Sequence, residues 1–303
     1  MNRPLAFTAR DLLAALAVVV IWGFNFVGMK LSLREFTPFQ LGALRYVFAA
    51  LPMVLLVRPP ALRWTWVAAA GLTQLAQFGL LFLALRLGMT AALASVLMQT
   101  QVFFTTLLGV MLLGERLSGP LRFALALTAL GLCFFAMHFV ASVAVGGITL
   151  LSLLLSLMAA SMWAASNIVA RRAQAVQPGF DALQFIVWMA LVPIVPFLAM
   201  SWFFDPAGSQ SNWVHASIGA WVGAAYLGWF ATVVAYSLWT WLLTRHPANR
   251  VAPFSLGVPV IGLVAGMVLL GEAVSGWQWA GSACVFAALG VVMFGGRLAQ
   301  RWR

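Results

Sequence analysis

The sequence predicts an all-α integral membrane protein whose ten transmembrane helices form two inverted five-helix repeats. Three observations lead to this fold class: the composition, ten apolar runs of spanning length, and a short polar motif that occurs twice. Of the 303 residues, 64% are hydrophobic and 8% are charged, and the mean hydropathy is +1.01. Soluble domains carry about 25% charged residues. The composition therefore excludes a soluble globular protein.

Ten apolar runs follow one another along the chain, and each is long enough to cross a bilayer as a helix of about 20 residues. They cover residues 12–31, 38–57, 65–85, 91–113, 120–139, 148–170, 182–203, 217–243, 248–270 and 277–296. The first run resembles a signal peptide, but no small-x-small cleavage pattern stands directly before Trp22, so we expect a retained helix. Ten spans leave no room for a soluble catalytic domain.

The basic residues indicate how the chain is threaded through the membrane. If the N-terminus is cytoplasmic, thirteen basic residues fall on the inner side, and only Lys30, Arg34 and Arg86 fall on the outer side. Because cytoplasmic connections carry the excess of Arg and Lys, we expect both termini in the cytoplasm. The net charge of +11 is then a topology signal and does not indicate a nucleic-acid partner.

A polar octet occurs twice, as LLGERLSG at Leu112–Gly119 and as LLGEAVSG at Leu269–Gly276. Each copy stands between two apolar runs. A weaker similarity pairs Trp22 and Asn25 with Trp163 and Asn167. These matches indicate an internal repeat.

Each half of the chain contains five predicted spans, so the second half must enter the membrane from the opposite side. We therefore expect a first five-helix repeat over residues 1–143 and a second, inverted repeat over residues 144–303. Inverted repeats are typical of secondary transporters, which hold their substrate near the midplane where the halves meet.

Several of these positions resemble one known family. Trp22, Gly23 and Phe26 form a Trp-Gly-x-x-Phe pattern, Arg45 lies early in the second run, and a Gly-Glu pair follows the fourth and ninth runs. Together they resemble the ten-helix EamA-type branch of the drug/metabolite transporter superfamily. Pro259 in the ninth run also fits, whereas the fourth run carries Gln101 where the family usually has a proline.

This resemblance implies a multi-pass exporter in a bacterial inner membrane. The Trp-rich runs and the Gln residues of the third and fourth runs are similar to bacterial exporters of amino acids, including aromatic ones. The same branch also exports purines, sugars, drugs and other metabolites, so those substrates stay open.

Polar side chains within the apolar runs are the candidate substrate contacts, because they are costly in a bilayer and usually face a cavity. Helical phase puts Gln74 and Gln77 on one face of the third run, and it turns Gln101 away from the stripe that contains Gln99. Amides can bind both charged groups of a zwitterion, and indoles offer apolar and cation-π contacts; alternatively, such side chains only join helices. The candidate substrate-binding residues are Trp22, Asn25, Gln74, Gln77, Gln99, Trp163, Asn167, Tyr236 and Ser255.

Three charged residues need separate interpretations. Arg45 lies about eight residues into the second run. It could contact a substrate carboxylate near the outer mouth, or it could snorkel to the interface or bind helix-end carbonyls. Glu115 and Glu272 sit in turns, where we expect each carboxylate to complement the N-terminus of the following helix.

An enzyme would need an acid–base or metal constellation, but His138, His215 and His246 are scattered at span ends. We therefore expect no catalytic residue, no metal and no cofactor. A receptor or structural protein would not require inverted halves with polar stripes. The sequence instead predicts a monomeric exporter, in contact with lipid and a small-molecule substrate, that works by alternating access.

Neutral or aromatic amino acids are the preferred substrates, with cationic drugs or dyes, purines and other metabolites as alternatives. The six acidic residues all lie at span ends or in connections, so no intramembrane carboxylate is expected to couple transport to protons. They are Asp11, Glu35, Glu115, Asp181, Asp205 and Glu272.

Overall fold

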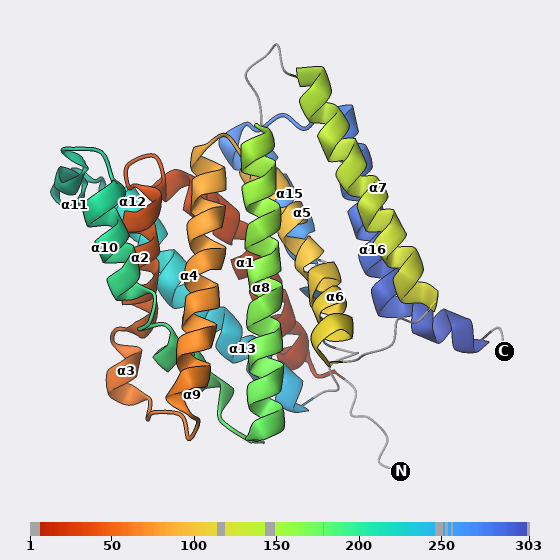
Figure 1. Cartoon of the computed structure of the whole chain (residues 1–303), viewed down its shortest axis with the longest axis horizontal. Coiled ribbons are helices and arrows are strands. Elements are labelled where there is room, and N and C mark those ends of the chain that lie inside the picture. Colours follow the sequence, from red (N-terminus) through yellow and green to blue (C-terminus); the bar gives the residue numbers. More distant parts are fainter. Residues whose placement is uncertain are drawn as a thin grey trace.

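The structure is a computed structural model, and all the regular secondary structure that it describes is helical (Figure 1). It describes residues 7–113, 119–142, 149–177, 179–245, 251, 254–255 and 257–301. Within these ranges no strand occurs, as the sequence predicted.

The first half contains α1 (Ala9–Ser32), α2 (Pro38–Ala50), α3 (Met53–Leu56), α4 (Trp64–Arg86), α5 (Ala91–Leu97), the 3₁₀ turn η1 (Met98–Thr100), α6 (Gln101–Leu113) and α7 (Gly119–Ser142). The second half contains α8 (Leu150–Val176), α9 (Ala182–Met189), α10 (Ile194–Phe204), η2 (Ser209–Ser211), α11 (Asn212–His215), α12 (Ile218–Ala225), the π-helical segment η3 (Tyr226–Val234), α13 (Ala235–Arg245), α15 (Gly257–Leu270) and α16 (Gly276–Arg301).

Seven helical stretches of the described chain are long and apolar enough to cross a membrane. They are Ala9–Ser32, Pro38–Leu56, Trp64–Arg86, Ala91–Leu112, Leu150–Val176, Ala182–Phe204 and Ile218–Trp239. Arg122–Phe135 and Gly257–Leu270 are shorter apolar helices. Each predicted apolar run overlaps one or more of the observed helices, and the chain is a multi-pass membrane protein.

Four of the predicted runs are interrupted rather than continuous helices. Pro52 separates α2 from α3 and Pro193 precedes α10, as expected for a residue that cannot donate a backbone hydrogen bond. The fourth run is interrupted by η1 although it lacks the family proline, and the eighth is interrupted by η3. Interrupted helices are common where a membrane protein binds its substrate.

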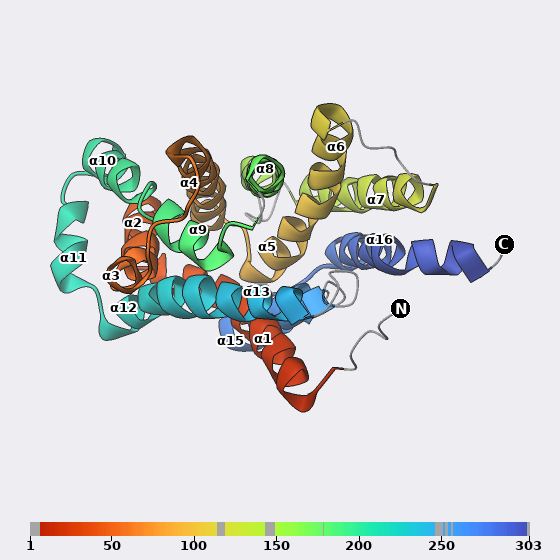
Figure 2. The ribbon, with the colours of Figure 1, turned by 90° about the horizontal axis from the view of Figure 1, so that it is seen from below.

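Most helices pack against partners from the other half of the chain. α4 packs against α8, α1 against α15, α5 against α15, and α2 against α10. α7 and α16 pack against each other at one side of the molecule (Figures 1 and 2). The two halves therefore share one bundle instead of forming separate domains.

Glycine permits the closest of these approaches. A Cβ atom on Gly262 would lie 2.4 Å from Ser95 Cβ, and one on Gly266 would lie 2.8 Å from the backbone nitrogen of Ala92. The Gly262-x-x-x-Gly266 spacing thus lets α15 pack directly against α5, as small residues do in membrane helix pairs.

Charged side chains close the helix ends at the side of the bundle where α1 ends. Lys30 Nζ donates to the carbonyl of Leu85, in the last turn of α4, and to the carbonyl of Met89, which follows α4. Both distances are 2.8 Å. Arg86 returns a hydrogen bond of 3.0 Å to the carbonyl of Leu33 at the end of α1. Each helix therefore supplies the cation that binds the other helix's terminal carbonyls.

Glu272 binds a different helix from the one that the sequence suggested. Its two carboxylate oxygens accept hydrogen bonds from the backbone nitrogens of Ala91 and Ala92, at 2.7 and 2.8 Å. The carboxylate thus caps α5, not the following helix α16, because the turn before α16 lies over the start of α5. Glu115 lies outside the described residues.

We expect Glu272→Ala to lower the free energy of unfolding by about 1–2 kcal/mol, since two N-terminal amides of α5 would lose their acceptor. Thermal unfolding of the detergent-purified protein measures this change.

The matched control is Glu35→Ala. Glu35 caps α12 through the backbone nitrogen and hydroxyl of Ser217, and these bonds hold its carboxyl pKa below the usual range. Because Glu35 is exposed, its loss should lower stability less. Equal effects of the two substitutions would contradict the role given to Glu272.

Candidate functional site

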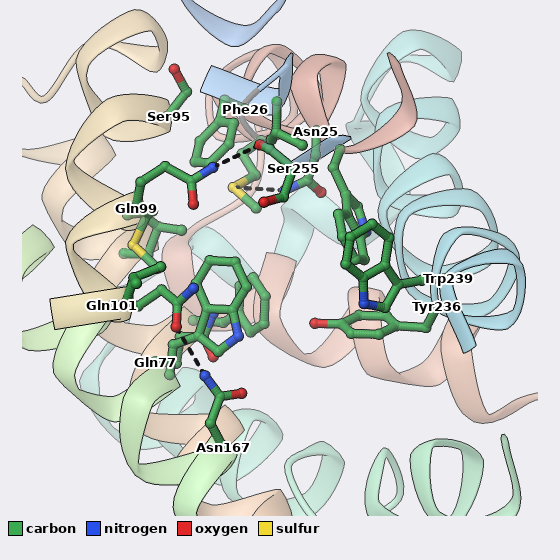
Figure 3. A pocket seen from close by; sticks show the side chains of 18 of the residues that line it. Asn25, Phe26, Gln77, Ser95, Gln99, Gln101, Asn167, Tyr236, Trp239 and Ser255 are labelled. Carbon is green, nitrogen blue, oxygen red and sulfur yellow. Dashed lines mark hydrogen bonds between the residues drawn. The ribbon is translucent and has the colours of Figure 1, made fainter. Parts of the chain in front are cut away.

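A cavity of about 340 Å³ lies inside the bundle and is bounded by helices from both halves (Figure 3). Its volume is that of a small-molecule site. The lining side chains are Trp22, Asn25, Phe26, Met29, Arg45, Gln77, Phe78, Leu81, Ser95, Met98, Gln99, Gln101, Val102, Trp163, Asn167, Tyr236, Trp239, Ser255 and Val258.

The cavity brings together most of the residues that the sequence singled out. Trp22, Asn25, Gln77, Gln99, Trp163, Asn167, Tyr236 and Ser255 all line it, and so does Arg45. Gln74 is the exception among the candidates. Its amide oxygen accepts from the hydroxyl of Tyr46 at 3.1 Å and its nitrogen donates to Ser166 at 3.4 Å. Gln74 therefore joins α4 to α2 and α8.

Aromatic rings form one wall of the cavity. The ring of Trp22 lies 5.1 Å from that of Tyr236 and 5.5 Å from that of Trp239, centroid to centroid. The indole nitrogen of Trp22 donates to the carbonyl of Ala231 at 3.0 Å. Since Ala231 belongs to η3, this hydrogen bond fixes the indole against the π-helical segment.

Amide side chains form the facing wall. Asn167 Nδ2 donates to Gln101 Oε1 at 2.9 Å, and Gln99 Nε2 donates to the carbonyl of Ser255 at 3.5 Å (Figure 3). Asn167 Nδ2 also donates to Thr105 Oγ1 at 3.2 Å. These bonds connect helices of opposite halves across the cavity.

Gln101 lines the cavity. Helical phase predicted that its side chain points away from the stripe that contains Gln99, and that prediction was wrong. On an uninterrupted α-helix Gln99 and Gln101 point in nearly opposite directions. The turn η1 ends immediately before Gln101, and a 3₁₀ turn has fewer residues per turn than an α-helix. The changed phase lets both amides reach the cavity. The sequence did contain a signal that could have identified Gln101 as a lining residue, namely a polar glutamine within an apolar run.

Arg45 does not snorkel to the surface. Its side chain is only 3% exposed, and its Nη1 donates to Asn25 Oδ1 at 3.0 Å. The guanidinium carbon stands 4.0 Å from the centre of the Phe78 ring, which is a cation-π contact. A carboxylate bound by Arg45 would therefore lie within the cavity and not at its mouth, because Arg45 points from α2 toward α1 and α4.

Some buried hydroxyl side chains bind the backbone of their own helices. Ser152 and Ser156 are fully buried and donate to the backbone carbonyls of Thr149 and Ser152, at 2.8 and 2.9 Å. Thr232 donates to the carbonyl of Leu227 at 2.9 Å. None of the three side chains lines the cavity.

A protein-family model, the EamA-like transporter family, matches residues 10–137 and 150–294. The chain belongs to the EamA-like transporter family. It is therefore a membrane transporter and not an enzyme.

Two bacterial proteins named "Probable amino-acid metabolite efflux pump" are similar over almost their whole length. The chain is 35% identical to the one from Escherichia coli strain K12, over 97% of each protein. It is 36% identical to the one from Salmonella typhimurium strain LT2, over 97% of this chain and 98% of that protein. A solved crystal structure shares the fold, with a TM-score of 0.63 at 18% identity, over 98% of this chain and 100% of the other.

We expect Trp163→Ala and Gln77→Ala to reduce transport while the protein remains folded, since each removes a side chain from the cavity wall. The loss of a stacking indole or a hydrogen-bonding amide should weaken substrate binding by about 1–3 kcal/mol. Flux into proteoliposomes of the purified variants measures the effect.

Trp279→Ala is the control, because Trp279 is 46% exposed on α16 and does not line the cavity. Normal flux in both cavity variants would rule out this cavity as the route of the substrate.

Proposed function

We propose that this protein exports small metabolites, foremost neutral or aromatic amino acids, across the bacterial inner membrane by alternating access. The observation that carries the proposal is the cavity between the two halves, lined by amides, hydroxyls and indoles. The names of the two bacterial relatives support efflux and the amino-acid class.

The packing supports ten spans in two inverted repeats. If α8 to α16 repeat α1 to α7, the contact of α4 with α8 has its counterpart in the contact of α1 with α12, η3 and α13. The contact of α1 with α15 has its counterpart in that of α6 with α8. In the pairs α2 with α10, α5 with α15 and α7 with α16, each helix would contact its own counterpart. Rocking of two such halves would expose the cavity to each side alternately.

The family match supports the same division, because one matched segment lies within residues 1–143 and the other within residues 144–303.

The cavity also contains a positive charge that favours some substrate classes over others. The guanidinium of Arg45 lines it and would repel a cationic drug or dye. A neutral or zwitterionic substrate meets no such repulsion.

The basic residues of the sequence support cytoplasmic termini, and cysteine labelling tests this orientation. In a protein whose Cys133 and Cys284 are replaced by alanine, Ala61→Cys should react with a membrane-impermeant thiol reagent only after the membrane is opened. Ala207→Cys should react in intact cells. Both positions are exposed in the structure. Labelling of Ala61→Cys in intact cells would reverse the proposed orientation.

No acidic side chain lines the cavity in the described part of the chain, so we propose transport down the substrate's own gradient. Proteoliposomes loaded in parallel with labelled L-phenylalanine, L-leucine, adenine or a quaternary ammonium ion test both the substrate class and the coupling. We expect flux of the amino acids, at equal rates with and without an imposed pH difference.

Transport of adenine or the quaternary cation without any amino acid would contradict the substrate class. Uphill accumulation that follows the pH difference and disappears with a protonophore would contradict uncoupled transport. Protein-free liposomes are the control for leakage.

A further inference from the structure

Arg45 is a buried cation for which the described residues provide no carboxylate partner. Its side chain is 3% exposed. It contacts the neutral amide of Asn25 and the ring of Phe78, and its Nε–H has no hydrogen-bond acceptor among the described residues. A buried charge is costly unless it is paired and its donors are satisfied. The cavity therefore contains a positive charge that the described residues compensate incompletely.

The acidic residues that the structure describes are engaged at helix ends. Asp11 accepts from Thr8, Asp181 from the backbone of Gln184, and Asp205 from Thr37 and Ser201. Glu35 and Glu272 cap α12 and α5. These acids stabilise helix ends and leave Arg45 without an internal counter-ion among the described side chains.

Gln77 is the second polar group of the cavity that is incompletely satisfied. Its side chain is 3% exposed, and its amide oxygen has no hydrogen-bond donor within the described structure. Gln77 immediately precedes Phe78, on whose ring the guanidinium of Arg45 rests. An unsatisfied donor and an unsatisfied acceptor thus belong to two residues that line the same cavity.

We propose that Arg45 and Gln77 bind the two charged groups of an α-amino acid, an inference that rests on the proposed export of amino acids. The guanidinium binds the α-carboxylate, and the amide oxygen of Gln77 accepts a hydrogen bond from the α-ammonium. A guanidinium presents paired N–H groups that match a carboxylate, and an amide oxygen can only accept.

The rest of the cavity then receives the side chain of the substrate. The indoles of Trp22, Trp163 and Trp239 also line it, and aromatic faces provide apolar contact for aromatic and aliphatic side chains alike. This arrangement selects for the head group of the substrate and tolerates different neutral side chains.

Substrate analogues test the head-group site on the unmodified protein. In counterflow of labelled L-phenylalanine in proteoliposomes, unlabelled L-phenylalanine is compared with L-phenylalaninamide, which lacks the carboxylate, and with 3-phenylpropionate, which lacks the ammonium. We expect each analogue to inhibit at least about 10-fold more weakly, since each leaves a charge-assisted hydrogen bond unmade. Labelled L-leucine with L-leucinamide repeats the test on an aliphatic side chain.

Substitutions test which residue binds the carboxylate and which binds the ammonium of the substrate. Arg45→Gln should abolish the preference for the acid over its amide, and Arg45→Lys, which keeps the positive charge, should retain part of it. Gln77→Leu should abolish the preference for the amino acid over 3-phenylpropionate. Gln74→Leu is the matched control on the same helix, and its selectivity ratios should equal those of the unmodified protein.

The outcomes separate the two proposals. Amino-acid flux that the amides inhibit as strongly as the parent acids would overturn the head-group site while the exporter function stands. Absence of amino-acid flux would overturn both. If Arg45→Gln does not fold, the analogue series on the unmodified protein still decides the matter.

Discussion

Backbone groups left open where a helix ends or breaks must find partners inside the protein, because a bilayer core offers no water to them. In this chain, side chains from other helices fill that need. Glu272 accepts from the first amides of α5, and Lys30 donates to one carbonyl in the last turn of α4 and to one that follows this helix. These contacts join segments that are far apart in sequence. They therefore fix the helix ends and the relative positions of the helices together.

The same constraint shapes the cavity. Two interrupted helices contribute to its walls, one where η1 separates α5 from α6 and one where η3 separates α12 from α13. The turn η1 brings both Gln99 and Gln101 to the cavity, and the carbonyl of Ala231 in η3 holds the indole of Trp22. Irregular backbone within a membrane is tolerated where it lines a cavity. The break at η1 thus forms part of the cavity wall directly, and the break at η3 positions a side chain of that wall.

The sequence predicted the features that depend on composition and period. The apolar runs coincide with helices because the thickness of the bilayer sets their length, and most candidate residues line the cavity because polar groups in such runs are costly elsewhere. The partner of Glu272 and the phase of Gln101 could not be predicted. The first depends on packing between distant segments, and the second depends on a single 3₁₀ turn that has no proline to mark it.

The burial of Arg45 could not be predicted from the sequence either. It changes which substrate charge the cavity favours. Without an intramembrane carboxylate, aromatic faces alone would still admit a cation. In the structure the Phe78 face is already occupied by the guanidinium of Arg45, so an entering cation meets repulsion instead. A zwitterion brings a carboxylate to this charge and adds no net charge to the cavity. For the proposed exporter, the loaded and empty cavities then carry the same net charge, and the membrane potential does no work on the substrate. The concentration gradient of the substrate alone then sets the direction of transport.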